Sequence, residues 1–154
     1  MILWRISNHA TLNGIGGLFA SARWHTQGRR IVYLAENPGD ALLEILVHLE
    51  IGESTLPDGY QLMKANVADT VSRERLDMTT LPAGWEDDPI PTRRIGDGWL
   101  RQAESALLEV PSAIVPETWN CLLNPDHADA AGVRIEWSNR FPYDSRLLRT
   151  LRCK

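Results

Sequence analysis

Several polar residues stand inside otherwise apolar segments of this 154-residue chain, and they are its first candidates for chemistry. Arg23 follows a glycine loop, Tyr33 is central in the apolar run 31–35, and Glu44 interrupts an apolar helical pattern. Arginine can bind phosphate or carboxylate oxygens in pairs, and a carboxylate can stabilise a positive charge. Each residue alone also has a structural explanation, as a surface ion pair, a core aromatic or a helix-face charge.

Three further polar residues lie near apolar runs in the second half of the chain. Ser112 lies between two prolines, and Asn120 and Asn124 flank a short apolar segment. His48 follows Glu44 by one helical turn, and both lie away from the leucine stripe of that helix. This position suits either solvent or a cleft.

The diagnostic motifs of common enzyme classes are missing from the sequence. The glycine loop at 14–17 is followed by Phe19, where a dinucleotide-binding fingerprint requires a third glycine. The chain has no Walker lysine, no nucleophile elbow and no HExxH motif. Phosphoryl transfer, zinc hydrolysis and serine hydrolysis therefore have little support.

Metal binding is not predicted either. Asp126, His127 and Asp129 lie in a proline-containing turn, where surface polarity explains them better than metal coordination. The two cysteines, Cys121 and Cys153, do not form a CxxC pair. So few cysteines favour a reducing, cytoplasmic setting.

Composition and charge restrict the choice of partner. The chain is 44% hydrophobic and 23% charged, and no apolar run approaches the roughly 18 residues of a membrane span. A net charge of −4 argues against direct nucleic-acid binding. Residues 134–154 nevertheless hold six basic and two acidic residues, which fits either a solvated face or a docking surface for something acidic.

Hydrophobic periodicity predicts more strands than helices. The predicted strands are 2–6, 31–35, 60–67, 107–110, 112–115, 119–123 and 133–138. The predicted helices are 41–51, with Asp40 as N-cap and Gly52 as its end, and 93–105. We interpret 79–91, with its three prolines, as a surface loop rather than a domain boundary. No regular βαβ series appears, so the fold class is α+β in a single domain.

The order of six short segments resembles the RES domain family, known as the toxin half of bacterial toxin–antitoxin pairs. They are Trp4–Ser7, Gly17–Trp24, Val32–Ala35, Ala41–Glu44, Val110–Ala113 and Asn120–Pro125. The likeness covers nearly the whole chain, so 1–154 is interpreted as one RES domain. His25 departs from the asparagine that is common after Arg-Trp in the family, which leaves its role open.

This resemblance implies a fold similar to the ADP-ribosyltransferases, with flanking helices and a split β-core that holds NAD in a cleft. It also implies a toxin that consumes NAD as substrate, without a prosthetic group, by cleaving the nicotinamide–ribose bond. The acceptor stays open: water, phosphate, or a cellular protein that would be ADP-ribosylated. A non-catalytic interaction module that retains the fold is a further alternative.

The site residues implied by the resemblance are Glu44, Tyr33, Arg23, Arg5, Ser112 and Asn124. Glu44 would stabilise the oxocarbenium character that develops on the ribose. Arg23, helped by Arg5, would bind the pyrophosphate, and Tyr33 would stack on nicotinamide. The serine and the asparagine would donate neutral hydrogen bonds to ribose or carboxamide.

The family resemblance also implies a partner, an Xre-type helix-turn-helix antitoxin. We expect it to cover the NAD cleft and to carry any DNA binding, which the acidic chain itself does not favour. An acidic side chain or terminal carboxylate of the partner would suit a cleft containing Arg5 and Arg23. Stoichiometry and the roles of His48 and the basic C-terminal segment stay open.

Overall fold

The computed structural model describes residues 1–48, 59–141, 144 and 146–147, which contain one seven-stranded sheet. The strand order is β4-β5-β6-β2-β1-β3-β7, and every neighbouring pair is antiparallel except the parallel pair β4–β5. The strands are β1 Ile2–Ser7, β2 Val32–Ala35, β3 Gln61–Val67, β4 Arg73–Arg75, β5 Leu107–Pro111, β6 Trp119–Leu123 and β7 Val133–Arg140. The α+β prediction is confirmed.

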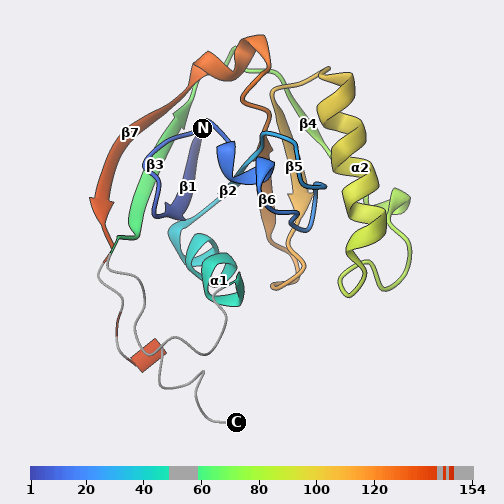
Figure 1. Cartoon of the computed structure of the whole chain (residues 1–154), viewed down its shortest axis with the longest axis horizontal. Helices are drawn as coiled ribbons and strands as arrows, with labels where there is room; N and C mark the ends of the chain where they lie inside the picture. The colour runs from blue at the N-terminus through green and yellow to red at the C-terminus, as the bar shows by residue number, and fades with distance from the viewer. Residues whose placement is uncertain (49–58, 142–143, 145, 148–154) are drawn as a thin grey trace.

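The sheet is nearly divided between β1 and β2. One residue pair, Trp4 with Ala35, joins these strands, whereas β1 and β3 are aligned over six pairs and β2 and β6 over four. Beyond this pair the two strands diverge, so β7-β3-β1 and β2-β6-β5-β4 form two parts that open away from each other (Figure 1). This is the split β-core that the family resemblance implied.

Helix α1, Pro38–His48, lies below the split and packs against β1 and β2 (Figure 1). It begins earlier than predicted because Asn37, not Asp40, acts as its cap: the Asn37 side-chain oxygen accepts from the Asp40 N–H at 2.9 Å. The predicted helix end at 49–52 falls outside the described residues.

Helix α2, Pro89–Gln102, lies beside β4 and β5 at the other end of the sheet (Figure 1). The Asp88 side chain caps it, and Pro89 opens its first turn, where a missing N–H costs nothing. The prediction of a loop through residue 91 was therefore wrong, because Pro89 and Pro91 belong to the helix rather than precede it.

Two more differences lie around β5. The predicted strand 112–115 is a turn, because the Ser112 hydroxyl accepts from the N–H groups of Ile114 and Val115 at 3.1 and 3.2 Å. Strand β4 was not predicted, because its sequence Arg-Glu-Arg is exposed and shows no apolar alternation.

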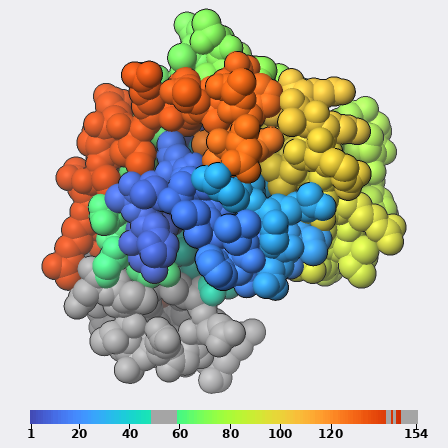
Figure 2. Space-filling view, turned by 45° about the horizontal axis from the view of Figure 1, so that its top comes forward, coloured from blue at the N-terminus to red at the C-terminus, as the bar shows by residue number. Residues whose placement is uncertain are grey.

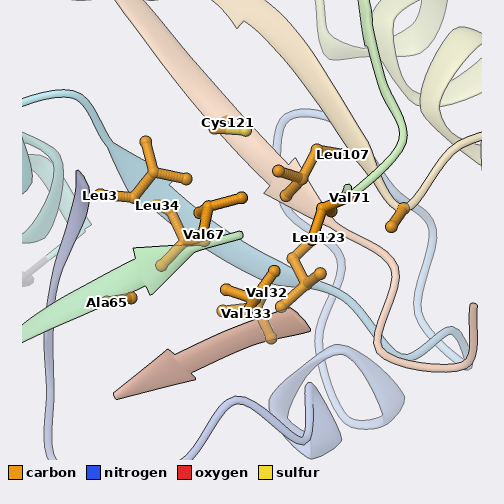
Figure 3. Close-up of a cluster of buried hydrophobic side chains, with 11 residues drawn as sticks. Leu3, Val32, Leu34, Ala65, Val67, Val71, Leu107, Cys121, Leu123 and Val133 are labelled. Atoms are coloured by element: carbon orange, nitrogen blue, oxygen red, sulfur yellow. The ribbon is translucent and has the colours of Figure 1, made fainter. Parts of the chain in front are cut away.

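The main core joins both parts of the sheet (Figure 3). Leu3, Leu34, Val67 and Leu123 pack there, and buried Cys121 lies among them. Burial raises the pKa of the Cys121 thiol to about 12, so this cysteine is structural rather than reactive. Cys153 lies outside the described residues.

A second core lies under α2 and is built around three tryptophans, Trp24, Trp85 and Trp99. The connection between β1 and β2, which includes the short helix η1 Ile15–Leu18, fills the middle of the molecular face in Figure 2 (blue), between β7 (red) and α2 (yellow). Among the described helices, neither α1 nor α2 is long and apolar enough to cross a membrane.

Candidate functional site

A cleft of about 300 Å³ lies where β1 and β2 diverge. Residues of β1, β2 and α1 form most of its wall, and the segment before Arg23 and the first half of β6 complete it. Its polar lining consists of Arg5, Ser7, Asn8, Ser21, Tyr33, Glu44, His48, Tyr60 and Asn120. The split in the sheet therefore creates the space in which these side chains meet.

Glu44 enters the cleft from α1 and is anchored through one carboxylate oxygen. Its Oε1 accepts from Asn120 Nδ2 at 2.5 Å and from Ser112 Oγ at 3.4 Å. The Ser112 oxygen already accepts two backbone N–H groups of its own turn, which leaves its proton for Glu44. Within the described part of the chain, Glu44 Oε2 has no hydrogen-bond partner, so it is available to a ligand.

Arg5 enters the cleft from β1 without a carboxylate partner among the described residues. Its guanidinium donates to the Thr11 carbonyl at 3.0 Å and to Ser7 Oγ at 3.4 Å. Burial lowers its pKa, although an arginine of this kind stays charged. Other arginines, such as Arg29 with Asp97, are paired with acids. A partly buried cation without a carboxylate partner in the described part of the chain favours an anionic ligand.

Tyr33 lines the cleft from β2, but its hydroxyl is engaged behind the wall. The Trp24 N–H donates to it at 3.1 Å, and His25 Nδ1 lies 2.8 Å away. Burial raises the pKa of Tyr33 well above its usual range, so the phenol stays neutral. The hydroxyl thus holds the segment 24–25 against β2, which gives His25 a structural role that the sequence had left open.

Arg23 and Asn124 do not line the cleft. The Arg23 guanidinium donates to the Trp85 carbonyl at 3.0 Å, although its neighbours Ser21 and Ala22 do line the cleft. Asn124 is buried after the end of β6, where its side-chain oxygen accepts from the backbone N–H of Asp126. The structure thus brings Arg5, Tyr33 and Glu44 together in the cleft and places Ser112 against Glu44. Arg23 and Asn124 lie outside the cleft.

Asn120 contacts Glu44 but was not selected as a site residue from the sequence. It flanks the same buried run as Asn124, and only the register of β6 against β2, which sets Asn120 opposite Ala35, places it beside Glu44. The helical spacing of Glu44 and His48 was the available signal for the position of His48, which also lines the cleft.

The remaining candidate groups have structural contacts. His127 Nδ1 accepts from the Asp129 N–H at 3.0 Å, and the Asp129 carboxylate accepts from the Ser72 hydroxyl at 2.6 Å. No cluster of three metal-ligating side chains occurs within the described residues. In the basic C-terminal segment 134–154, residues 142–143, 145 and 148–154 lie outside them.

Three comparisons with known proteins agree with one another. The RES domain family model matches residues 2–145. A protein named Toxin Res from Pseudomonas putida is 46% identical over 147 residues, which cover 96% of this chain and 99% of that protein. The Prs ADP-ribosylating toxin of Sphingobium sp. is 38% identical over 156 residues, which cover 95% of this chain and 96% of that protein.

One solved structure has a similar fold at low sequence identity. A chain in the crystal structure of the M. tuberculosis MbcT-MbcA toxin-antitoxin complex superposes with a TM-score of 0.75 at 16% identity. The match covers 99% of this chain and 89% of that chain. The shared architecture therefore extends over nearly the full length of both chains.

Proposed function

This chain belongs to the RES domain family, and we propose on that basis that it is a toxin that binds NAD and cleaves the nicotinamide–ribose bond. One observation carries the proposal. Among the described residues, Glu44 is a carboxylate with one unbonded oxygen, Arg5 is a partly buried arginine without a carboxylate partner, and both line the same cleft. Those are the two charges that NAD cleavage needs, one for a developing cation and one for the pyrophosphate.

In the proposed reaction, the bond between nicotinamide and the ribose C1′ breaks first, and nicotinamide leaves with the bonding electrons. Positive charge then develops on the ribose, and the Glu44 carboxylate stabilises it. The acceptor donates an electron pair to C1′ and loses a proton. Arg5 binds the pyrophosphate. Arg23 can add a second positive charge only if its guanidinium leaves the Trp85 carbonyl and turns toward the cleft. Tyr33 offers its ring, rather than its engaged hydroxyl, for stacking on nicotinamide.

Two reactions are consistent with this function, and they differ in the group that accepts ADP-ribose. With water or phosphate, the protein is an NAD glycohydrolase or phosphorylase. With a protein side chain, it is an ADP-ribosyltransferase, and the name of the Sphingobium relative, an ADP-ribosylating toxin, favours this second candidate. Both versions use NAD as substrate and require no prosthetic group or metal.

We also propose that an Xre-type helix-turn-helix antitoxin silences the enzyme by covering the cleft. The similar fold in a toxin-antitoxin complex supports a protein partner. Arg5, which has no carboxylate partner among the described residues, suits an acidic side chain or a terminal carboxylate of that partner. DNA binding would then belong to the antitoxin.

The deciding experiment follows NAD and nicotinamide by NMR after the purified protein is added, with and without phosphate and with cell extract. Release of nicotinamide is the expected result. The co-product then identifies the acceptor: free ADP-ribose, ADP-ribose phosphate, or labelled ADP-ribose attached to protein. If NAD stays intact under all three conditions, the chain is an interaction module that retains the fold, and the proposal is wrong.

A further inference from the structure

We propose that Asn120 is a positioning residue that fixes the Glu44 carboxylate and determines which of its oxygens faces the ribose. This inference rests on the proposed function, because it concerns the same cleft and the same reaction. Asn120 is the closest hydrogen-bond partner of Glu44, at 2.5 Å, and it belongs to a different element of the fold. The contact therefore ties the cleft side of α1 to the sheet.

The sheet holds Asn120 rigidly. The residue lies in β6 between two other strands, opposite Ala35 of β2 on one side and Val110 of β5 on the other. Its exposed fraction is 9%. Glu44, in contrast, lies on a helix whose outer face is exposed at Leu43 and Val47. A side chain fixed in the middle of a sheet can thus set the conformation of a longer side chain on a helix.

In this contact Asn120 is the donor and Glu44 the acceptor of the hydrogen bond. An amide nitrogen can donate but cannot accept, so this hydrogen bond requires an acceptor oxygen on Glu44 and is strongest when the carboxylate is ionised. Turning the amide around would bring two oxygens together, which disfavours that alternative.

The contact also distinguishes the two carboxylate oxygens. Asn120 and Ser112 both donate to Oε1, and within the described residues neither they nor any other group donates to Oε2. A partial rotation of the carboxylate would break both hydrogen bonds at once. Asn120 therefore holds the carboxylate in the orientation in which one oxygen is bonded and the other can meet the developing positive charge.

Two substitutions test this role through the kinetics of nicotinamide release. Asn120→Asp keeps the shape but sets a second carboxylate against Glu44, and we expect kcat at neutral pH to fall about 100-fold with little change in KM. Because two such carboxylates can share a proton, activity should recover partly as the pH is lowered. Asn120→Ser, which only removes the donor, should lower kcat about 10-fold, the change expected for a hydrogen bond to a charged group.

Asn66→Asp is the matched control, because it makes the same change at an exposed position of β3. It should leave kcat and the pH profile as in the parent. The inference is overturned if Asn120→Asp keeps the parent kcat and pH profile. It is also overturned if both Asn120 variants only lower the melting temperature while their folded fraction reacts like the parent.

A second measurement does not depend on turnover. The Asn120 side-chain amide protons, assigned by their loss in Asn120→Ser, should resonate downfield and move upfield in Glu44→Gln, whose acceptor is uncharged. An unchanged signal would overturn the contact itself. If the parent releases no nicotinamide but this signal moves, the proposed function fails while the anchoring of Glu44 by Asn120 stands.

Discussion

The two helices use their polar side chains in opposite ways. In α2, Asp88 caps the first turn, Thr92 donates to the Arg23 carbonyl at 2.6 Å, and Arg93 donates to the Ala22 carbonyl at 2.8 Å. In α1, Glu44 reaches into a cleft with one oxygen unbonded among the described residues. The side chains of Asp88, Thr92 and Arg93 are thus engaged within the fold, whereas Glu44 has an oxygen that can accept a hydrogen bond from a ligand.

The comparison also shows that α2 shapes the cleft without lining it. Its contacts fix the backbone of residues 22–24, and Ala22 belongs to the cleft wall. The hydroxyl of Tyr33 holds the other side of this segment through Trp24. We therefore expect substitutions in α1 to change the reaction first, and substitutions in α2 to change stability first.

The largest effect should come from Glu44→Gln. The substitution keeps the size of the side chain and its acceptor for Asn120 but removes the charge, so we expect kcat to fall 100- to 1000-fold, roughly 3–4 kcal/mol of transition-state stabilisation. The free energy of unfolding should change by less than about 1 kcal/mol. Nicotinamide release and thermal unfolding measure the two quantities. Glu74→Gln, on exposed β4, is the control, and a fully active Glu44→Gln variant would contradict our assignment.

The next effect should come from Gly96→Ala in α2. A Cβ atom at this position would lie 1.8 Å from the Trp24 carbonyl oxygen, so the helix must move away from segment 22–24. We expect the free energy of unfolding to fall by about 3 kcal/mol, the upper range for an overpacked core. Gly98→Ala is the matched control in the same helix, because a Cβ atom there meets nothing within 4 Å. This variant should raise the free energy of unfolding by up to about 1 kcal/mol, since alanine favours the helix more than glycine. Equal stability of the two variants in urea unfolding would show that α2 does not press on this segment.

The sequence predicted the elements whose pattern is local. Apolar runs and helical spacing were sufficient for the strands at 2–6 and 119–123 and for α1. They failed for β4, which the parallel pairing with β5 stabilises through backbone contacts from a distant part of the chain. They failed again at 112–115, where the hydroxyl of Ser112 diverts a β-branched run into a turn.

The site was predictable only in part for a related reason. The family resemblance supplied Glu44 and Ser112, which the structure places in contact. Asn120 and Asn124 look equivalent in the sequence, because each borders the same buried run. Strand register separates them, since four residues span about 13 Å along a strand. Such long-range register cannot be read from local periodicity.

A smaller effect is expected from Tyr33→Phe, which tests whether the hydroxyl belongs to the cleft or to its support. The variant keeps the ring but leaves the Trp24 N–H and His25 Nδ1 without their partner. We expect a loss of about 1–3 kcal/mol in unfolding free energy, the usual consequence of unsatisfied buried polar groups. NAD turnover per folded molecule should stay within a few-fold of the parent. A large loss of turnover at an unchanged melting temperature would instead place the hydroxyl in the reaction.

The smallest effect should be a pH dependence of stability that originates at His25, whose side chain is only 3% exposed. Burial lowers the pKa of His25. The backbone of Ala20 and Gly17 and the charge of Asp97 raise it less than burial lowers it, and Arg93 adds a small lowering effect. In the unfolded chain the imidazole takes up a proton near its ordinary pKa of about 6.5, before the folded chain does. The unfolded state therefore binds more protons below that pH, and the free energy of unfolding should fall as the pH drops from 7 toward the lowered pKa of the folded state.

Urea unfolding at a series of pH values measures the slope of the free energy of unfolding against pH. The slope should become smaller in His25→Asn. It should stay as in the parent in His9→Asn, the control, because His9 is exposed. An equal slope in the two variants would assign the pH dependence to another group and would leave His25 only its contact with Tyr33.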